Sequence, residues 1–339
     1  MTSPAASTES TSPRVMRRAQ YDRYGPPEVL RVAEVPVPVP GPGEVLVRVH
    51  ATSVNGGELL ARSGRLRWVT RGPFPRGTGV DFAGEVAHVD GSPTGPGDLA
   101  VGDRVWGVLP RRQYASGRAG AAAEHVAVPA GHVAPSPAGL DLVRAAALPV
   151  VGTTAITALR DQVRLQPGER LLVRGASGGV GSVAVQLGRA LGARVTGLAS
   201  RRHLDLVREL GAEEALDRAQ VAPDDLGTFD VVLDTAGSDL AAYRRLLGPR
   251  GRMVTITPDF THLAASAGYL AGSVVFGSRR VRFFTGTPTR PLLAALTAHV
   301  EAGEVRPVVD TVHPLAGIAG AHRAAGAGGS RGKHVVRLV

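Results

Sequence analysis

A glycine-rich segment in the middle of the chain constrains the fold more than any other feature. It reads LLVRGASGGVGSVAVQLGRALGARVTGLAS over residues 171–200. An apolar strand leads into Gly175, Gly178 and Gly181, and a helix follows. Such glycines let a backbone approach a pyrophosphate and let helix and strand pack closely, while the helix N-terminus favours an anion. A glycine run alone is more often a turn, but the strand–loop–helix–strand context predicts a dinucleotide site formed by Ser177, Gly178, Gly179 and Val180.

The end of the second strand indicates which nicotinamide cofactor is bound. NAD-binding units usually place an acidic residue there, which holds the ribose hydroxyls. The stretch RVTGLAS at residues 194–200 has no acidic residue, and Arg201 and Arg202 follow Ser200. A hydroxyl with one or two guanidinium groups suits a 2′-phosphate. The sequence therefore favours NADPH over NADH; the alternative is that both arginines are ordinary solvated side chains.

Two patterns divide the chain. From residue 16 to about 134, short strands alternate with Gly/Pro turns, and Val45, Val47 and Val49 alternate as in a half-buried strand. From about residue 140, helical runs and strands alternate, which predicts βαβ units around a parallel sheet. Two more helices, a strand-like VRPVVDTVHP and a closing strand KHVVRLV follow residue 285. The expected fold class is α/β, preceded by a compact β unit such as a barrel.

Composition excludes several classes of protein. The 339 residues correspond to roughly two domains, and no cysteine is present, which rules out disulfides, thiolate metal sites and cysteine nucleophiles. Lys333 is the only lysine among 39 basic residues, so the net charge of +10 comes almost wholly from arginine, most simply through nucleotide bias of the genome. Because the arginines are scattered without interleaved aromatic residues, we expect no nucleic-acid partner.

The N-terminal segment does not predict an export signal, and the sequence does not predict a membrane-spanning helix. Residues 1–15, MTSPAASTESTSPRV, lack hydrophobic periodicity and predict a disordered tail. Arg17 and Arg18 are not followed by an apolar core, and no run of about 18 apolar residues occurs. A cytoplasmic protein with no membrane partner is expected.

A series of motifs recurs in a specific order and spacing over residues 16–339: YGPPEVL, GPGEVLVRVHATSVN, GVDFAGEV, VGDRVWG, AAEHVAVP, AALPVVGTTAITAL, GERLLVRGASGGVGSVAVQLGRALGA, FDVVLDTAG and RGKHVVRLV. Together they resemble the zinc-independent quinone oxidoreductase branch of the medium-chain dehydrogenase/reductase superfamily, which also contains enoyl reductases. The resemblance implies a GroES-like β-barrel domain from residues 16–139 and 285–339, with a Rossmann NADPH-binding domain at 140–284 between them. It also implies a homodimer, because relatives commonly join their Rossmann sheets edge to edge.

The resemblance also bears on metal. The alcohol-dehydrogenase branch has a cysteine ligand at the position of Asn55, and a His-Glu pair at Val80 and Asp81. The four-cysteine structural zinc lobe is absent as well. The histidines show no ligand spacing, so we expect no metal ion.

Residue roles follow from the same resemblance. Asn55 lies beside the nicotinamide in relatives, where it would donate its amide to the substrate carbonyl as charge develops; alternatively, it caps a helix that begins near Gly56. Further contacts with the cofactor are implied for Thr154, Thr235, Phe284 and Lys333. Thr154 could equally bond its own helix backbone, Phe284 could pack in the core, and Lys333 could approach the cofactor phosphates or serve a structural role.

The chain departs from the family pattern after Asn55. Relatives often have Asn-Pro-x-Asp followed by a tyrosine, where this chain has NGGELL. The aromatic proton donor of some enoyl reductases is therefore not found there. Tyr114 and Tyr269 lie in no matching motif, so water is the expected proton source.

The resulting hypothesis is an NADPH-dependent oxidoreductase that reduces a quinone or an α,β-unsaturated carbonyl compound, a small electrophilic acceptor, by hydride transfer. The nicotinamide supplies the hydride, and the protein supplies orientation and electrostatics. The alternatives are an enoyl-thioester reductase of fatty-acid or polyketide assembly and a catalytically inactive NADPH-binding sensor.

Overall fold

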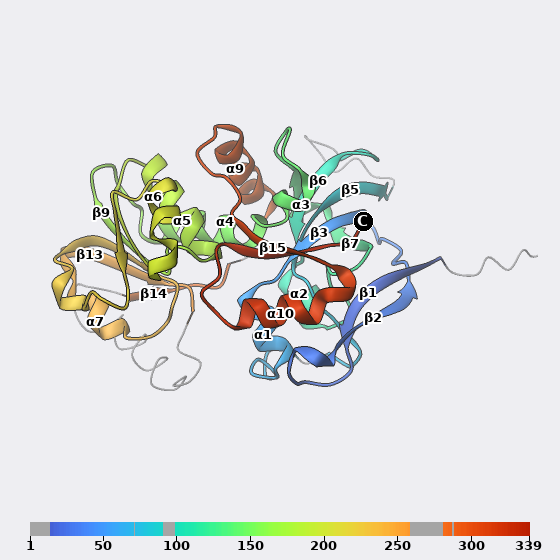
Figure 1. Ribbon diagram of the computed structural model, residues 1–339. Coiled ribbons are helices and arrows are strands. Elements are labelled where there is room, and N and C mark those ends of the chain that lie inside the picture. The colour runs from blue at the N-terminus through green and yellow to red at the C-terminus, as the bar shows by residue number, and fades with distance from the viewer. Residues whose placement is uncertain (1–13, 71, 91–98, 258–280, 287) are drawn as a thin grey trace, which may run out of the picture.

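The computed structural model describes residues 14–70, 72–90, 99–257, 281–286 and 288–339. Two lobes lie side by side, with helices α4 (Pro149–Ile156) and α9 (Arg290–Glu301) between them (Figure 1). The predicted disordered tail falls almost wholly outside the described residues, as does Tyr269.

The first lobe is built on a seven-stranded sheet in the order β15-β16-β3-β5-β6-β8, with β7 also paired to β3. Val45, Val47 and Val49 of β3 are buried, which confirms the alternation predicted for this strand. Because β16 pairs antiparallel with β3, the last strand completes a sheet that the N-terminal half begins. The strands are β3 (Glu44–Ser53), β5 (Asp81–Val89), β6 (Arg104–Val108), β7 (His125–Pro129), β8 (Val133–Pro135), β15 (Val309–Pro314) and β16 (Lys333–Arg337).

Smaller elements complete this lobe. A three-stranded sheet has the order β2-β1-β4, and α1 and α10 pack against each other. Residues 37–43, rich in proline, form no strand, because proline lacks the amide that a sheet requires. The elements are β1 (Val15–Tyr21), β2 (Leu30–Pro36), β4 (Arg76–Gly77), α1 (Gly56–Arg62), α2 (Arg111–Ala115) and α10 (Ile318–Gly326).

The second lobe is a six-stranded parallel sheet in the order β11-β10-β9-β12-β13-β14. Relative to its first strand this is the order 3-2-1-4-5-6 of a Rossmann fold, in which ligands bind where the order reverses, here between β9 and β12. The elements are β9 (Arg170–Arg174), α5 (Gly179–Ala190), β10 (Arg194–Ala199), α6 (Leu204–Glu209), β11 (Glu214–Asp217), β12 (Phe229–Asp234), α7 (Leu240–Arg245), β13 (Leu247–Thr255) and β14 (Val281–Phe283).

The helical stretch before β9 is divided. A short helix α3 (Leu142–Ala145) ends before Pro149, which begins α4, and a π-helical turn at Thr157–Gln162 follows. Proline favours the first turn of a helix and disrupts its interior, which explains the break. Helix α4 packs on α5 and α9, so it joins the two lobes.

The start of β16 is the point at which the first lobe touches the glycine-rich segment. Gly332 N donates to Ser177 O at 2.7 Å, and Gly178 and Gly332 form an isolated parallel bridge. The next residue, Lys333, donates its backbone N–H to Val308 O at 3.0 Å. These contacts place the side chain of Lys333 between the two lobes.

A buried histidine in α10 makes stability depend on pH. His322 is fully buried, and neither ring nitrogen has a hydrogen-bond partner among the residues that the structure describes. Burial, assisted by the nearby Arg62 guanidinium, lowers the pKa of His322 to about 3. Since a histidine in the unfolded chain has its pKa near about 6.5, acid protonates the unfolded state first and so favours unfolding.

We therefore expect the free energy of unfolding to fall by about 2 kcal/mol between pH 7.5 and pH 5 because of His322. His322→Leu should remove this part of the pH dependence in urea unfolding measured at both pH values. His88→Leu, at an exposed position of β5, is the matched control and should retain it. An unchanged pH dependence in His322→Leu would contradict the assignment.

Candidate active site

The glycine loop has the geometry of a phosphate cradle. Gly175 has a φ of +72°, which a side chain would strain, and Gly178 is the N-cap of α5. A Cβ on Gly181 would lie 2.1 Å from the carbonyl oxygen of Gly175. Only glycine at position 181 therefore allows the helix to come this close to the loop. The amides of the first helical turn have no intrahelical acceptor. The loop therefore fits a pyrophosphate, as the sequence predicts.

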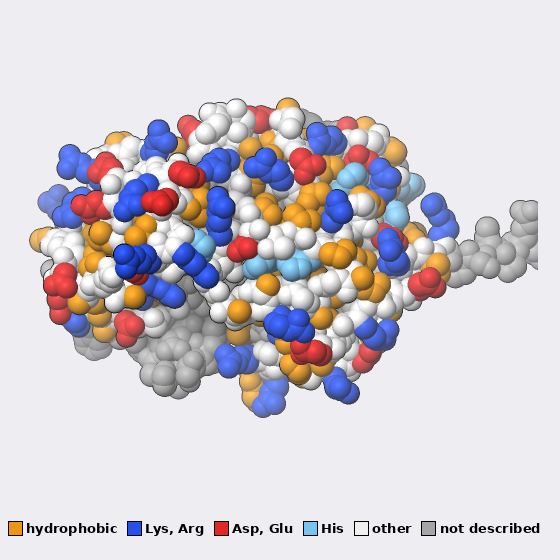
Figure 2. All heavy atoms as spheres, in the orientation of Figure 1, with side chains coloured by type: hydrophobic (Ala, Val, Ile, Leu, Met, Phe, Trp, Pro, Cys, Tyr) orange, Lys and Arg blue, Asp and Glu red, His pale blue; other side chains and the backbone are white. Residues whose placement is uncertain are grey.

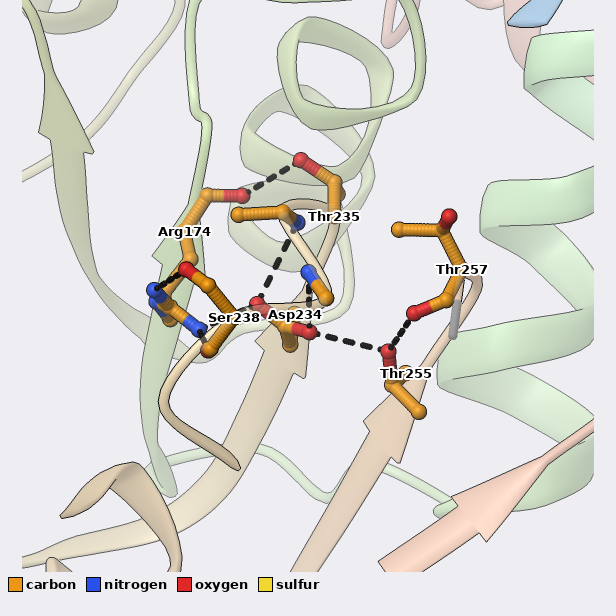
Figure 3. Close-up of polar contacts among 8 residues, drawn as sticks. Arg174, Asp234, Thr235, Ser238, Thr255 and Thr257 are labelled. Atoms are coloured by element: carbon orange, nitrogen blue, oxygen red, sulfur yellow. Dashed lines mark hydrogen bonds and ion pairs between the residues drawn. The ribbon is translucent and has the colours of Figure 1, made fainter. Parts of the chain in front are cut away.

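A buried ion pair lies next to this loop, between the ends of β9 and β12 (Figure 3). Arg174, the last residue of β9, donates through Nη1 to Asp234 Oδ1 at 2.6 Å and to Ser238 O at 2.7 Å. Asp234 is fully buried at the end of β12 and also accepts from Gly237 N at 2.9 Å and Thr255 Oγ1 at 2.8 Å. The sequence analysis did not detect this pair. Its signal is a charged residue directly after the apolar run of each of two strands, Arg174 after residues 171–173 and Asp234 after residues 231–233.

Thr235 lies directly beneath the glycine loop. Its hydroxyl donates to Arg174 O at 2.7 Å, and a Cβ on Gly175 would lie 2.3 Å from the same hydroxyl oxygen. Thr235 thus packs against the backbone that forms the cradle. Its predicted contact with the cofactor stays a prediction.

The residues predicted to bind the adenosine end are close together after β10. Ser200 Oγ is buried and has no hydrogen-bond partner within the described part of the chain. Arg201 is exposed and makes no hydrogen bond or ion pair with the residues that the structure describes. Arg202 donates through Nη2 to Gly329 O at 2.6 Å, and His203 Nε2 lies 3.0 Å from the same oxygen. An orphaned hydroxyl beside a free guanidinium fits a 2′-phosphate, while Arg202 already binds the other lobe.

Asn55 is the N-cap residue of α1, but its side chain does not cap the helix. Its Nδ2 donates to Ser53 O at 3.1 Å and to Glu58 Oε1 at 3.0 Å, while its Oδ1 accepts from Lys333 Nζ at 2.7 Å. Both amide protons are therefore in use. Donation to a substrate carbonyl would need one of these bonds to be exchanged, so the catalytic role of Asn55 stays a prediction.

Two buried carboxylates complete the network around Asn55. Glu58 accepts from Gly79 N at 3.1 Å and Thr78 Oγ1 at 3.3 Å. Asp81 accepts from the backbone and hydroxyl of Ser53, at 3.0 and 2.8 Å. The sequence analysis assigned no role to Glu58; the Asn-x-x-Glu spacing at the start of a helix is a capping-box signal that could have singled it out.

The charges in this network perturb one another. Burial, followed by repulsion from Asp81, raises the pKa of Glu58 to about 7, against the opposing effects of Asn55 and Lys333. Burial also raises the pKa of Asp81 and lowers that of Lys333. Two carboxylates thus face one ammonium in a buried site, which is the kind of environment that active sites use to tune proton affinity.

The other predicted contacts are distributed around the loop. Thr154 Oγ1 donates to Val150 O at 2.7 Å within α4, as the alternative interpretation expected. Phe284 and Val180 are partly buried against the main hydrophobic core. The Lys333 ammonium points to Asn55 and Val54 O, while its stem lies over Gly179, where a Cβ would be 2.8 Å from Lys333 Cδ. Contact of these side chains with a cofactor stays a prediction.

Comparison with known proteins follows this geometry. The alcohol dehydrogenase GroES-like domain matches residues 41–138, and the zinc-binding dehydrogenase family matches residues 210–336. The mouse mitochondrial NAD(P)H oxidoreductase RTN4IP1 is 31% identical, with 98% of this chain and 92% of that protein covered. The chain belongs to the medium-chain dehydrogenase/reductase superfamily. Within this superfamily, it falls in the zinc-independent branch.

Further relatives of this superfamily are similar over nearly the whole chain. An Arabidopsis thaliana protein described as an NADPH-dependent alkenal/one oxidoreductase is 30% identical over 91% of this chain and 75% of its own. The quinone oxidoreductase of Coxiella burnetii superposes with a TM-score of 0.82 at 26% identity, with 96% of this chain and 100% of that chain covered. A mycobacterial structure complexed with NADPH has a TM-score of 0.80 at 25% identity, with coverage of 95% and 100%. The chain is therefore an oxidoreductase that uses a nicotinamide cofactor.

The positions compared with the zinc branch hold other groups in this chain. Asn55 and Asp81 interact with the ammonium of Lys333. Within the described residues, no three His, Cys, Asp or Glu side chains are placed to hold a metal ion. The same residues include no helix long and apolar enough to cross a membrane.

Proposed function

We propose that this oxidoreductase uses NADPH to reduce a quinone or an α,β-unsaturated carbonyl compound. The observation that carries the proposal is the arrangement of two sites on one structure: a glycine loop that fits a pyrophosphate, and a buried polar network at Asn55 beside it. A bound nicotinamide supplies the hydride. The names of the relatives in Arabidopsis and Coxiella support the two acceptor classes.

The acceptor class is tested by NADPH oxidation with a panel of a benzoquinone, a short enone and a crotonyl thioester. We expect turnover with the quinone or the enone. Preference for the thioester would favour the enoyl-thioester reductase alternative. Tight binding of NADPH without turnover of any acceptor would favour a sensor and contradict the proposal.

The preference for NADPH is proposed to come from Ser200 and Arg201, with Arg202 secondary. Among the residues that the structure describes, Ser200 Oγ has no hydrogen-bond partner and Arg201 makes no hydrogen bond or ion pair, whereas Arg202 must release Gly329 O to reach a phosphate. A hydrogen bond to a charged group contributes about 1.5–3 kcal/mol, which is a factor of about 10 to 100 in affinity.

Arg201→Ala is therefore expected to weaken NADPH binding about 10-fold to 100-fold and to leave NADH binding unchanged. Calorimetric titration with both dinucleotides measures this, with Arg202→Ala compared directly and with Arg208→Ala as the control. Arg208 lies on α6 and pairs with Asp205 at 2.8 Å. Equal affinity of the wild-type chain for NADH and NADPH would contradict the assignment.

Assembly and location belong to the same proposal. A homodimer is expected from the family, and β14 is the terminal strand of the Rossmann sheet. Figure 2 shows basic and acidic side chains interleaved over the visible face rather than one basic patch, in keeping with a small-molecule acceptor and no nucleic-acid partner. A cytoplasmic location stays a prediction. Light scattering on a size-exclusion column would report the oligomeric state.

A further inference from the structure

The only lysine of the chain lies in the candidate active site. All 38 other basic residues are arginine, so the bias of this chain toward arginine extends to every basic position except Lys333. Lys333 is also buried, at 6% exposure. Lysine carries a compact ammonium whose pKa shifts on burial, whereas a guanidinium keeps its proton in proteins. Arginine therefore cannot replace lysine where the side chain must give up a proton.

The hydrogen bonds of Lys333 leave one proton available. Nζ donates to Val54 O and to Asn55 Oδ1, and an ammonium has three donors. The third has no acceptor among the residues that the structure describes. Since the stem of the side chain crosses Gly179, the ammonium lies between the glycine loop and the start of α1.

The surrounding charges favour proton exchange at Nζ. The ionisable groups that interact with it are Asp81 of β5, Glu58 of α1 and His334, its neighbour on β16. Tyr114 of α2 and Tyr21 of β1 in turn face Glu58. Burial lowers the pKa of Lys333, and attraction to Asp81 and Glu58 opposes that effect. The group is therefore a more ready proton donor than an exposed lysine.

We propose that Lys333 is the proton donor of the reduction, acting on the oxygen of the acceptor. This assignment rests on the proposed function. As the acceptor carbon gains the hydride, the electron pair of its carbonyl system moves to the oxygen, which takes a proton from Lys333 Nζ. An enone then leaves as its enol and becomes the ketone in water. A quinone leaves as the keto tautomer that carries the new hydrogen on a ring carbon, and it becomes the hydroquinone in water when that carbon loses a proton and the second oxygen gains one. The neutral amine regains its proton from water, so one proton is consumed in each turnover.

Asn55 and Glu58 are positioning residues in this scheme. Asn55 Oδ1 fixes the ammonium, and Glu58 Oε1 fixes the amide of Asn55 through Nδ2. The flip of Asn55 that would present Nδ2 to Lys333 is disfavoured because it would place Oδ1 against two acceptors. These hydrogen bonds therefore hold Lys333 Nζ in one orientation beside Asn55.

Kinetics of two substitutions test the proton transfer. Lys333→Met removes the charge and proton at similar length, and Lys333→Arg retains the charge in a guanidinium that does not give up its proton in proteins. Both should lower kcat on the order of 10²-fold to 10⁴-fold while NADPH affinity, measured by calorimetry, changes less than about 10-fold. Full activity of Lys333→Arg would overturn proton donation in favour of charge stabilisation alone.

Chemical rescue gives a readout that a structural role would not change. In Lys333→Ala, added methylamine should restore turnover in proportion to its protonated form, and the restored rate should fall as pH rises through the pKa of the amine. Arg306→Ala, an exposed pair partner of Glu209 at 3.6 Å, should respond to no amine. Rescue that is absent in a variant shown by circular dichroism to be folded would overturn the proposal.

Because the chain has one lysine, a single NMR signal reports its proton affinity without turnover. Protein labelled with ¹³C-lysine should give one Cε resonance that titrates below the ordinary lysine value, and NADPH should shift it. Glu58→Gln should lower this pKa further by removing a neighbouring negative charge, whereas exposed Glu34→Gln should not. A Cε signal that titrates near 10.5 and ignores NADPH would overturn the assignment.

The outcomes separate the two proposals. If the wild-type chain turns over no acceptor, the proposed function fails and the role of Lys333 fails with it. If the wild type is active and Lys333→Met stays within about twofold with the same pH profile, only the proton-donor assignment is overturned.

Discussion

Replacing Gly181 with alanine is expected to weaken NADPH binding on the order of 100-fold, about 2.7 kcal/mol. A Cβ at this position would lie 2.1 Å from Gly175 O and 2.9 Å from Ala176 Cα. Both neighbours are backbone, so neither can move without moving the loop. The helix must therefore shift away from β9, and the amides of its first turn lose their common direction toward a phosphate.

The measurement is calorimetric titration with NADPH, combined with thermal unfolding in the absence of the cofactor. Gly320→Ala is the control, because a Cβ in that part of α10 would meet no atom within 4 Å. It should leave NADPH affinity unchanged and stabilise the helix slightly. Wild-type affinity in a folded Gly181→Ala variant would show that the loop does not hold the pyrophosphate as described.

Much of the fold could be predicted from local sequence patterns. The structure buries Val45, Val47 and Val49, as their alternation predicts. It also forms the helix predicted to follow the glycine loop within residues 171–200. The division of the helical stretch at Pro149 was not predicted, although the residue itself is visible in the sequence. The sequence analysis weighed the helix propensity of the whole stretch, which one proline changes little. In the structure, the pyrrolidine ring of Pro149 decides where α4 begins.

The candidate active site was less accessible to sequence reasoning because it is non-local. Asn55 and Lys333 are 278 positions apart and meet only because β16 pairs with β3. The residue types could be read from the motifs, but the direction of the Lys333 ammonium toward Asn55 depends on packing. Glu58 and Asp81 likewise gain their importance from burial beside each other, which no spacing in the sequence reveals.

Arg174 and Asp234 show a second limit of sequence reasoning. Each residue ends a strand, Arg174 in β9 and Asp234 in β12. These two strands are not consecutive in the sequence and become neighbours because the strand order of the sheet reverses between them. The pair is nearly inaccessible to water, with side-chain exposures of 8% and 0%. The Arg174 guanidinium also stacks on the ring of Tyr243 at 3.6 Å. The ion pair therefore links the glycine loop to the packing of α7.

Asp234→Ala is expected to lower the free energy of unfolding by about 3–5 kcal/mol, because it leaves the buried Arg174 guanidinium without its counter-ion. It also removes the acceptor of Gly237 N and Thr255 Oγ1. Because Thr235 and the loop rest on this arrangement, NADPH binding should weaken in the same variant. Urea unfolding and calorimetric titration measure the two effects.

Matched variants separate the buried charge from the hydrogen bonds. Asp234→Asn keeps an acceptor oxygen without the charge, so its loss of stability should lie between the wild type and Asp234→Ala. Asp205→Ala breaks an exposed pair with Arg208 and should change the unfolding free energy little, since water screens such pairs. If Asp234→Ala were as stable as Asp205→Ala, the pair would not support the loop. The uncompensated guanidinium would then have to reach solvent, which its stacking on Tyr243 opposes.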